Sequence, residues 1–235
     1  MKIIALESSA ITASVAVTEN DRLLAQSFQN SGLTHSATLM PMVSDLLKNT
    51  GLTLDEMDVV AVAAGPGSFT GVRIGVAAAK GLAWPGDKPC APCSTLESMA
   101  WQCAHVGGEI CAAMDARRNQ VYCARFRAEN GELTRLTPDR AMGLDELSEE
   151  IRASGKLQTL VGDGTHLVQK ALEEAGLPCA PMPPHLIYQT AWGVARAALR
   201  MAQEGKLVSA AAMAPSYHRL SQAERERLER LSKTE

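Results

Sequence analysis

The sequence has 235 residues, 46% of them hydrophobic, and a formal net charge of −3. This length allows one or two domains with a substantial core, and the acidic balance argues against a surface that binds nucleic acid as a whole. The chain has no apolar run of about eighteen residues and no signal-like start, so we expect a cytoplasmic protein without a membrane segment. Its six cysteines are then expected to be reduced and buried.

The start of the chain predicts an antiparallel meander. Residues 2–6 form an apolar run, residues 14–18 alternate between polar and apolar, and residues 22–28 follow after a short turn. The loop after the first strand is acidic and rich in hydroxyl groups, and consists of Glu7, Ser8 and Ser9.

Apolar residues at helical spacing predict an amphipathic helix over residues 35–49, which Gly51 ends. The apolar face of this helix needs a partner, either within the chain or outside it. The positions that form it are Leu39, Met42, Val43 and Leu46.

The most informative stretch runs from Gly65 to Gly75 and reads GPGSFTGVRIG. A buried strand over residues 58–64 precedes it, and a helix follows. A glycine-rich loop at a helix N-terminus offers backbone N–H groups to an anion, but this loop lacks the Gly-Lys-Ser/Thr ending of a P-loop. Phosphate contact and a simple connecting turn both stay open, and the candidate contacts are Gly65, Gly67 and Ser68.

Small residues fall four apart on the helix that follows the loop. Small side chains along one side of a helix let a second helix approach closely. This second helix belongs either to the same domain or to a partner chain. The residues concerned are Gly71, Gly75 and Ala79, with Ala77 and Ala78 beside them, and Val72 is counted with the same predicted interface.

A second unit begins near residue 107 and repeats the plan of the first. An apolar run over residues 110–114 ends in Asp115, and an alternating strand over residues 121–127 follows a polar loop. The two halves, residues 1–106 and residues 107–235, therefore look like diverged copies of one arrangement.

A second glycine turn lies between a strand at residues 159–161 and a helix at residues 165–175. Its glycines, Gly162 and Gly164, are possible nucleotide contacts, although a lone Gly-x-Gly is usually only a turn. Further helices are expected over residues 144–153 and 189–204, and Ser221 to Glu224 has the form of a capping box that begins a C-terminal helix.

These halves match the duplicated actin/Hsp70/sugar-kinase (ASKHA) architecture, an α/β fold with two mixed-sheet subdomains and flanking helices. In that architecture a nucleotide lies between the halves. Glu7 and Asp115 would face its phosphates, with Ser8 and Ser9 beside them.

Four motifs spread over almost the whole chain resemble those of the TsaB (YeaZ) family. Apart from the glycine-rich stretch, they are Ser94-Thr95-Leu96-Glu97, Met114-Asp115-Ala116-Arg117 with Val121-Tyr122, and Pro215-x-Tyr217-x-Arg219. The first loop reads Glu7-Ser8-Ser9 where the family usually has Asp-Thr-Ser, and His218 stands where it usually has Leu.

The resemblance implies a role in forming N6-threonylcarbamoyladenosine (t6A) at position 37 of tRNAs that read codons beginning with A. It implies a non-catalytic scaffold and activator that works with a TsaD-like catalytic paralogue and a TsaE-like ATPase. The assembled complex uses ATP and Mg²⁺ and receives the tRNA. The isolated chain is expected to bind no cofactor and to form a homodimer. The partner interface is expected on the helices of residues 1–106, at the apolar and small residues named above.

The catalytic paralogue carries a His-x-Glu-Gly-His metal motif shortly after its own glycine loop. Residues 92–99 of this chain contain no histidine, and His-x-x-x-His occurs nowhere in it. Cys90 and Cys93 are spaced like a redox or zinc pair, but no second pair accompanies them, and we favour a structural role. No metal site is therefore expected.

Two other classes of function stay open. The first is a stand-alone ATPase or small-molecule kinase of the same architecture, which would use Glu7, Asp115 and the two glycine turns. The second is a direct tRNA-binding module, against which the acidic balance and the small number of aromatic residues argue.

Overall fold

The structure is a computed structural model that describes residues 1–218 of the chain. The expected C-terminal helix after Ser221, and Arg219 of the last motif, lie outside the described residues.

The first half of the chain forms a five-stranded mixed sheet with the order β3-β2-β1-β4-β5. Strands β1, β2 and β3 are antiparallel neighbours. On the other side of β1, β4 pairs with β1 in parallel, and β5 pairs with β4 in parallel. The predicted meander and the buried strand before the glycine loop are thus confirmed. The strands are β1 (Lys2–Glu7), β2 (Ala13–Glu19), β3 (Arg22–Gln29), β4 (Val59–Gly65) and β5 (Cys90–Ser94).

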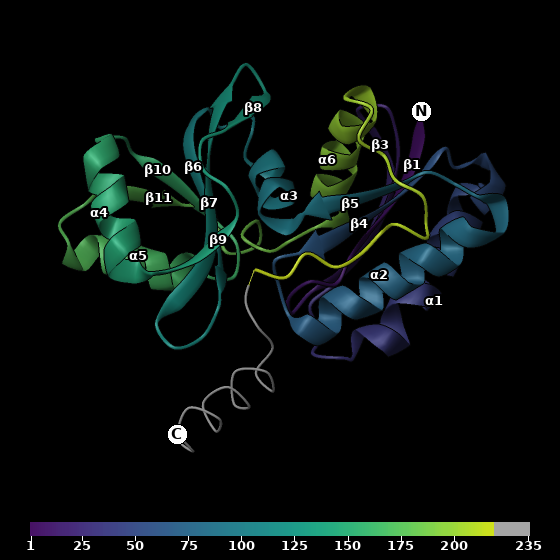
Figure 1. Cartoon of the computed structure of the whole chain (residues 1–235), viewed down its shortest axis with the longest axis horizontal. Coiled ribbons are helices and arrows are strands. Elements are labelled where there is room, and N and C mark those ends of the chain that lie inside the picture. Colours follow the sequence, from purple (N-terminus) through teal and green to yellow (C-terminus); the bar gives the residue numbers. More distant parts are fainter. Residues whose placement is uncertain (219–235) are drawn as a thin grey trace, which may run out of the picture.

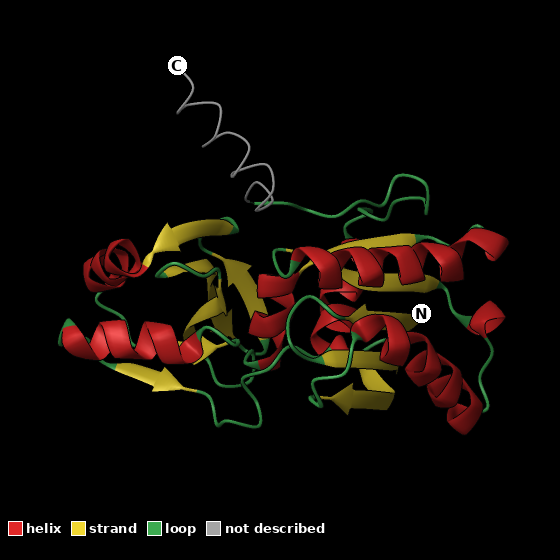
Figure 2. Ribbon diagram, turned by 90° about the horizontal axis from the view of Figure 1, so that it is seen from below, coloured by secondary structure: helices red, strands yellow, loops and turns green. Residues whose placement is uncertain are grey.

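Helices cover both faces of this first sheet (Figures 1 and 2). On one face lie α1 (His35–Thr50) and α2 (Phe69–Ala83), and on the other α3 (Thr95–Gln102) and α6 (Ala191–Gln203). The alternation of β1 explains this arrangement, because Ile4 and Leu6 point to the α1 and α2 face while Ile3 and Ala5 point to the opposite face.

The second sheet has the order β11-β10-β6-β7-β8, and β9 pairs separately with β7. Its strands are β6 (Gly108–Asp115), β7 (Gln120–Glu129), β8 (Glu132–Arg135), β9 (Arg140–Gly143), β10 (Gln158–Val161) and β11 (Cys179–Pro181). Helices α4 (Leu144–Ser154) and α5 (Thr165–Glu174) pack on one face of it.

Helix α6 returns the chain to the first sheet. It packs against β1, β2, β4 and β5, although it lies in the range expected for the second subdomain, residues 107–235. The packing is close because most of the buried residues of α6 are alanines; Gly193 in addition lies directly against the carbonyl of Ser98 in α3. The second half of the sequence therefore supplies one layer of the first half of the fold.

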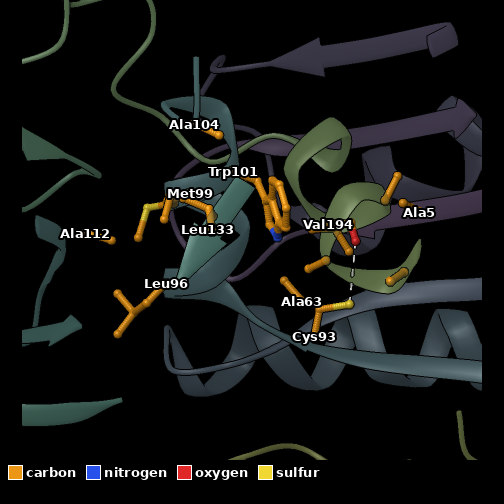
Figure 3. Close-up of a cluster of buried hydrophobic side chains, with 14 of the residues drawn as sticks. Ala5, Ala63, Cys93, Leu96, Met99, Trp101, Ala104, Ala112, Leu133 and Val194 are labelled. Atoms are coloured by element: carbon orange, nitrogen blue, oxygen red, sulfur yellow. Dashed lines mark hydrogen bonds between the residues drawn. The ribbon is translucent and has the colours of Figure 1, made fainter. Parts of the chain in front are cut away.

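Helix α3 lies between the two sheets and joins their cores. Its buried side chains belong to one cluster that includes residues from β1 and β4 on one side and from β6 and β7 on the other. Figure 3 shows Leu96 and Met99 on the side of α3 toward Ala112 of β6, and Trp101 on the side toward α6. The two halves thus share one apolar core.

This packing predicts that truncation of Met99 is costly. Met99 is fully buried, so Met99→Ala should lower the free energy of unfolding by about 2–5 kcal/mol, as measured by urea titration. Leu157→Ala is the control, because Leu157 before β10 is 55% exposed, and it should change stability by less than about 0.5 kcal/mol. Equal losses in the two variants would contradict the placement of α3.

Candidate functional site

A pocket of about 430 Å³ opens between the two halves, where β1, β4, β6 and β10 end. Four of the residues predicted to contact phosphate line it: Ser9, Gly67, Ser68 and Asp115. The remaining lining residues were not predicted and include Ile11, Phe69, Met114, Arg117, Tyr122 and Asp163.

The loop after β1 and the glycine loop are bonded to each other. The backbone N–H of Ser68 donates to the carbonyl of Ser9 (2.6 Å), and the hydroxyl of Ser8 donates to the carbonyl of Gly71 (2.9 Å). The hydroxyl of Ser68 caps α2 by accepting from the N–H of Gly71 (3.3 Å), as the sequence predicts. One wall of the pocket is therefore built from two loops that cannot move separately.

The small-residue side of α2 is explained by this close approach. A Cβ atom on Gly71 would collide with the carbonyl oxygen of Ser8, and one on Gly75 would lie 2.6 Å from the hydroxyl of Ser8. Val72 and Ala79 are buried in the same core, and Ala78 is half-buried. The interpretation of these residues as a surface for a partner helix is corrected, because they pack against this chain's own first loop and sheet.

The same correction applies to the apolar face of α1. Its side chains lie in the core that α1 and α2 form with the first sheet, and none is more than 5% exposed. The apolar face of α1 therefore packs against this chain's own sheet, and the opposite face of α1 points outward. The residues are Leu39, Met42, Val43 and Leu46.

Glu7 lies behind the pocket wall at the end of β1. Its carboxyl is completely buried and accepts the N–H of Ser9 at Oε1 (2.6 Å). Burial raises the pKa of Glu7 to about 7, and nearby Asp163 adds to the rise, while the hydrogen bonds from Ser9 oppose it. Glu7 therefore does not line the pocket itself but places a titrating charge just beneath it.

Two more acids approach the pocket from the second half. Asp115 ends β6, accepts the N–H of Arg117 (2.7 Å) and pairs with the guanidinium of Arg117 (3.2 Å). Asp163 lies in the turn between β10 and α5 and accepts the side-chain N–H of Gln189 (2.9 Å). Burial raises the pKa of Asp163, and the charge of Asp115 adds to that rise.

The two glycines of the second glycine turn have no N–H group to spare for a phosphate. The N–H of Gly162 donates to the carbonyl of Ile187 (2.8 Å), and that of Gly164 to the carbonyl of Ala113 (3.0 Å). A Cβ atom on either glycine would overlap the end of β6. The prediction of a nucleotide contact at Gly162 and Gly164 is therefore corrected, because these glycines permit close packing of the turn on β6.

Residues 206–218, the C-terminal strap, cross the open edge of the first sheet and reach the glycine loop. Val208 exchanges two backbone hydrogen bonds with Cys90 of β5, and the N–H of Ser216 donates to the carbonyl of Ala64 (2.7 Å). Tyr217 stacks on Phe69, with 4.8 Å between the ring centroids, and accepts the Nε–H of Arg73 (2.7 Å). A side chain on Gly65 would collide with the carbonyl of Ser216, so Gly65 is needed where the strap crosses.

The cysteines have no place in the pocket. Cys90 and Cys93 are buried and free, and burial raises the pKa of both thiols. Within residues 1–218, no group of three or more His, Cys, Asp or Glu side chains is arranged to hold a metal ion.

Comparison with known proteins places this geometry in a family. Residues 29–226 match the family described as TsaD: tRNA N6-adenosine threonylcarbamoyltransferase. The chain is 31% identical over 222 residues to an Escherichia coli protein named tRNA threonylcarbamoyladenosine biosynthesis protein TsaB, covering 93% of this chain and 95% of that one. The chain belongs to the TsaB (YeaZ) family. A Bacillus subtilis TsaB is 34% identical over 174 residues, which are 74% of this chain and 76% of the relative.

Solved structures agree with this family and with the fold. YeaZ from Pseudomonas aeruginosa superposes with a TM-score of 0.79 at 25% identity, over 92% of this chain and 99% of that one. The (R)-2-hydroxyglutaryl-CoA dehydratase component A of Acidaminococcus fermentans is similar in fold alone, with a TM-score of 0.50 at 12% identity, over 86% of this chain and 99% of that one. The predicted duplicated ASKHA architecture is confirmed.

None of the helices within residues 1–218 has the length and apolar character that crossing a membrane requires.

The burial of Glu7 predicts a distinctive dependence of stability on pH. The pKa of Glu7 is about 7 in the folded chain and near 4.5 in the unfolded chain. The contribution of Glu7 to the free energy of unfolding is therefore fully present below pH 4.5 and is lost as the pH rises through 7. In the unmodified protein, the free energy of unfolding should fall by about 3 kcal/mol between pH 4.5 and 8 because of Glu7. This fall should be absent from Glu7→Gln when urea unfolding is measured at each pH. The exposed Glu149→Gln is the control and should follow the unmodified protein. Parallel stability curves for Glu7→Gln and the unmodified protein would show that Glu7 does not titrate as described.

Proposed function

We propose that this chain is a non-catalytic scaffold and activator subunit for t6A formation at position 37 of tRNAs that read codons beginning with A. The observation that carries the proposal is the similarity to Escherichia coli TsaB over 93% of the chain, since that relative is named as a t6A biosynthesis protein. The match to the TsaD family over residues 29–226 supports a kinship with the catalytic enzyme.

The region that corresponds to the paralogue's metal motif supports a non-catalytic role. Residues 92–99 contain no histidine and fold into the end of β5 and the start of α3. Leu96 and Met99, which lie in this region, are completely buried in the core between the sheets. Apolar packing thus takes the place where the paralogue would need imidazole ligands.

The partners follow from the same family relation. The chain would act in the cytoplasm with a TsaD-like catalytic paralogue and a TsaE-like ATPase, and the assembled complex would use ATP and Mg²⁺ and engage the tRNA. When the paralogue is missing, the same surface of the chain would serve for a homodimer.

The outward faces of α1 and α2 are the surface we propose for the paralogue. The two helices are in contact on one side of the first sheet, and most of their exposed residues are small or apolar, with charges at Asp45, Lys48 and Arg73. Met40 is 43% exposed, and Trp84, at the end of α2, is 66% exposed. A face with many small and apolar side chains suits helix-on-helix packing. Its other members include Ala37, Pro41, Ser44, Thr70, Ala77 and Gly81.

A charge in the middle of this face should prevent pairing. Ala77→Glu is expected to weaken binding of the TsaD-like paralogue by at least about tenfold in isothermal titration calorimetry while the protein stays folded. Ala153→Glu on the exposed side of α4 is the matched control and should bind normally. Undiminished binding by Ala77→Glu would exclude this face. Gly75→Leu is unsuitable as a test, because its side chain would overlap Ser8 and Val62 and disturb the fold.

The function is tested by reconstitution. Unmodified tRNA, threonylcarbamoyl-AMP, ATP, Mg²⁺, the paralogue and the ATPase are combined with and without this chain, and t6A is measured by mass spectrometry of the tRNA nucleosides. We expect t6A only when both this chain and the paralogue are present. Formation of t6A without this chain, or ATP turnover by this chain alone, would contradict the proposal.

A further inference from the structure

Arg73 carries the charge on the outward face of α2. The other exposed residues of this helix, Thr70, Ala77 and Gly81, are uncharged. Within residues 1–218, the side chain of Arg73 makes one hydrogen bond, from its Nε–H to the hydroxyl oxygen of Tyr217 (2.7 Å), and pairs with no acid. The positive charge of Arg73 therefore has no partner of opposite sign in the described part of the chain.

Two aromatic rings hold the guanidinium of Arg73 in place. Its Cζ atom lies 3.7 Å from the centroid of the Phe69 ring and 5.7 Å from that of the Tyr217 ring, distances at which a ring face attracts a cation. The two rings stack on each other. Because Nε is bonded to Tyr217, the N–H groups on Nη1 and Nη2 remain, and such a planar fork matches the two oxygens of a carboxylate.

The ring of Tyr217 reaches Arg73 because the C-terminal strap is fixed along its length. Val208 pairs with Cys90, and Met213 is 1% exposed in the core that α1 and α2 form with the first sheet. Figure 1 shows the strap running alongside α2, where Lys80 donates to the carbonyl of Ala211 (3.3 Å). The guanidinium is thus held in one position before any partner binds, which lowers the entropic cost of binding.

Pairing with the TsaD-like paralogue would take water away from this charge. A helix packed on the outward faces of α1 and α2 would cover Arg73, and a desolvated cation without a counter-charge opposes binding. A carboxylate within reach of Nη1 and Nη2 would remove this penalty. Nucleic acid is a poorer match, because it needs several cations, and the exposed residues of α1 and α2 add only Lys48, whose charge Asp45 balances.

We propose that Phe69, Arg73 and Tyr217 form the anchor of the partner interface and bind the carboxylate of an Asp or Glu side chain of the paralogue. This contact rests on the proposed function, and it adds the chemistry that the paralogue must present. Arginine and tyrosine are enriched among the residues that carry most of the binding energy of interfaces. The interface then includes the end of the C-terminal strap as well as α1 and α2.

Isothermal titration calorimetry with the TsaD-like paralogue measures what the anchor contributes. Arg73→Gln should weaken binding by at least about tenfold and should make the affinity less dependent on salt concentration. Tyr217→Phe keeps the ring but loses the hydroxyl, so it should weaken binding by about threefold and keep the salt dependence. Lys170→Gln, on the exposed side of α5, is the control and should bind normally. Unchanged affinity in either anchor variant would overturn the proposal.

A carbodiimide reaction identifies the group that faces Arg73. Arg73→Lys keeps the charge and supplies an amine, which carbodiimide joins to a touching carboxylate as an amide while the reagent takes up the water and becomes a urea. Mass spectrometry of this variant mixed with the paralogue should find residue 73 linked to an Asp or Glu of the paralogue, and Lys170 unlinked. A link from residue 73 to a carboxyl group of this chain, or no link, would overturn the proposal.

Failure of this contact is distinguishable from failure of the proposed function. If the unmodified chain binds the paralogue and Arg73→Gln binds it equally well, the anchor is excluded and the scaffold function stands. If the unmodified chain does not bind the paralogue, both the anchor and the scaffold function are excluded.

Discussion

The packing of α3 between the two sheets is the interaction on which the rest of the structure depends. The helix is short, and its start is fixed by Ser94, whose hydroxyl accepts the N–H of Glu97 (3.1 Å). Its buried side chains contact both halves, and Gly193 lets α6 lie directly on it. Because this core is apolar and close-packed, it fixes how near the ends of β1 and β6 come to each other, and so it sets the width of the pocket.

The same close packing decides what the pocket can bind. The glycines predicted to contact phosphate bring backbone close to backbone: Gly65 lies against Ser216, Gly67 against Ser9, and Gly162 and Gly164 against β6. Two acids, Asp115 and Asp163, line the pocket, and Glu7 is buried behind its wall; burial raises the pKa of Glu7 and of Asp163. The lining of the pocket therefore carries two acids, and Arg117, which pairs with Asp115, is the cation among its lining residues.

Much of the fold could be predicted from the sequence. Alternation in β1 and β6, the helical spacing in α1 and the repeat of strand, acid and loop all reflect local geometry, which the residue pattern records directly. The return of α6 to the first sheet could not be predicted, because it depends on contacts with β1, β2, β4 and β5, which lie far away in the sequence and which no local pattern encodes. The short strands β8 and β9 were missed for a similar reason, since they are defined by their pairing with β7.

The sequence could not show which way the side chains of the predicted site residues face. The residues proposed for a partner interface were recognised correctly as apolar or small, but their spacing does not say whether they face this chain's own sheet or another protein. Asp163 and Gln189 were overlooked as site residues because they lie far from Glu7 in the sequence and meet it only when the halves pack.

Pairing of this chain with a TsaD-like paralogue is tested most directly by native mass spectrometry of the chain alone and mixed with that paralogue. The predicted result is a homodimer that is replaced by a complex of the two proteins, whereas two proteins that never share a peak would contradict it.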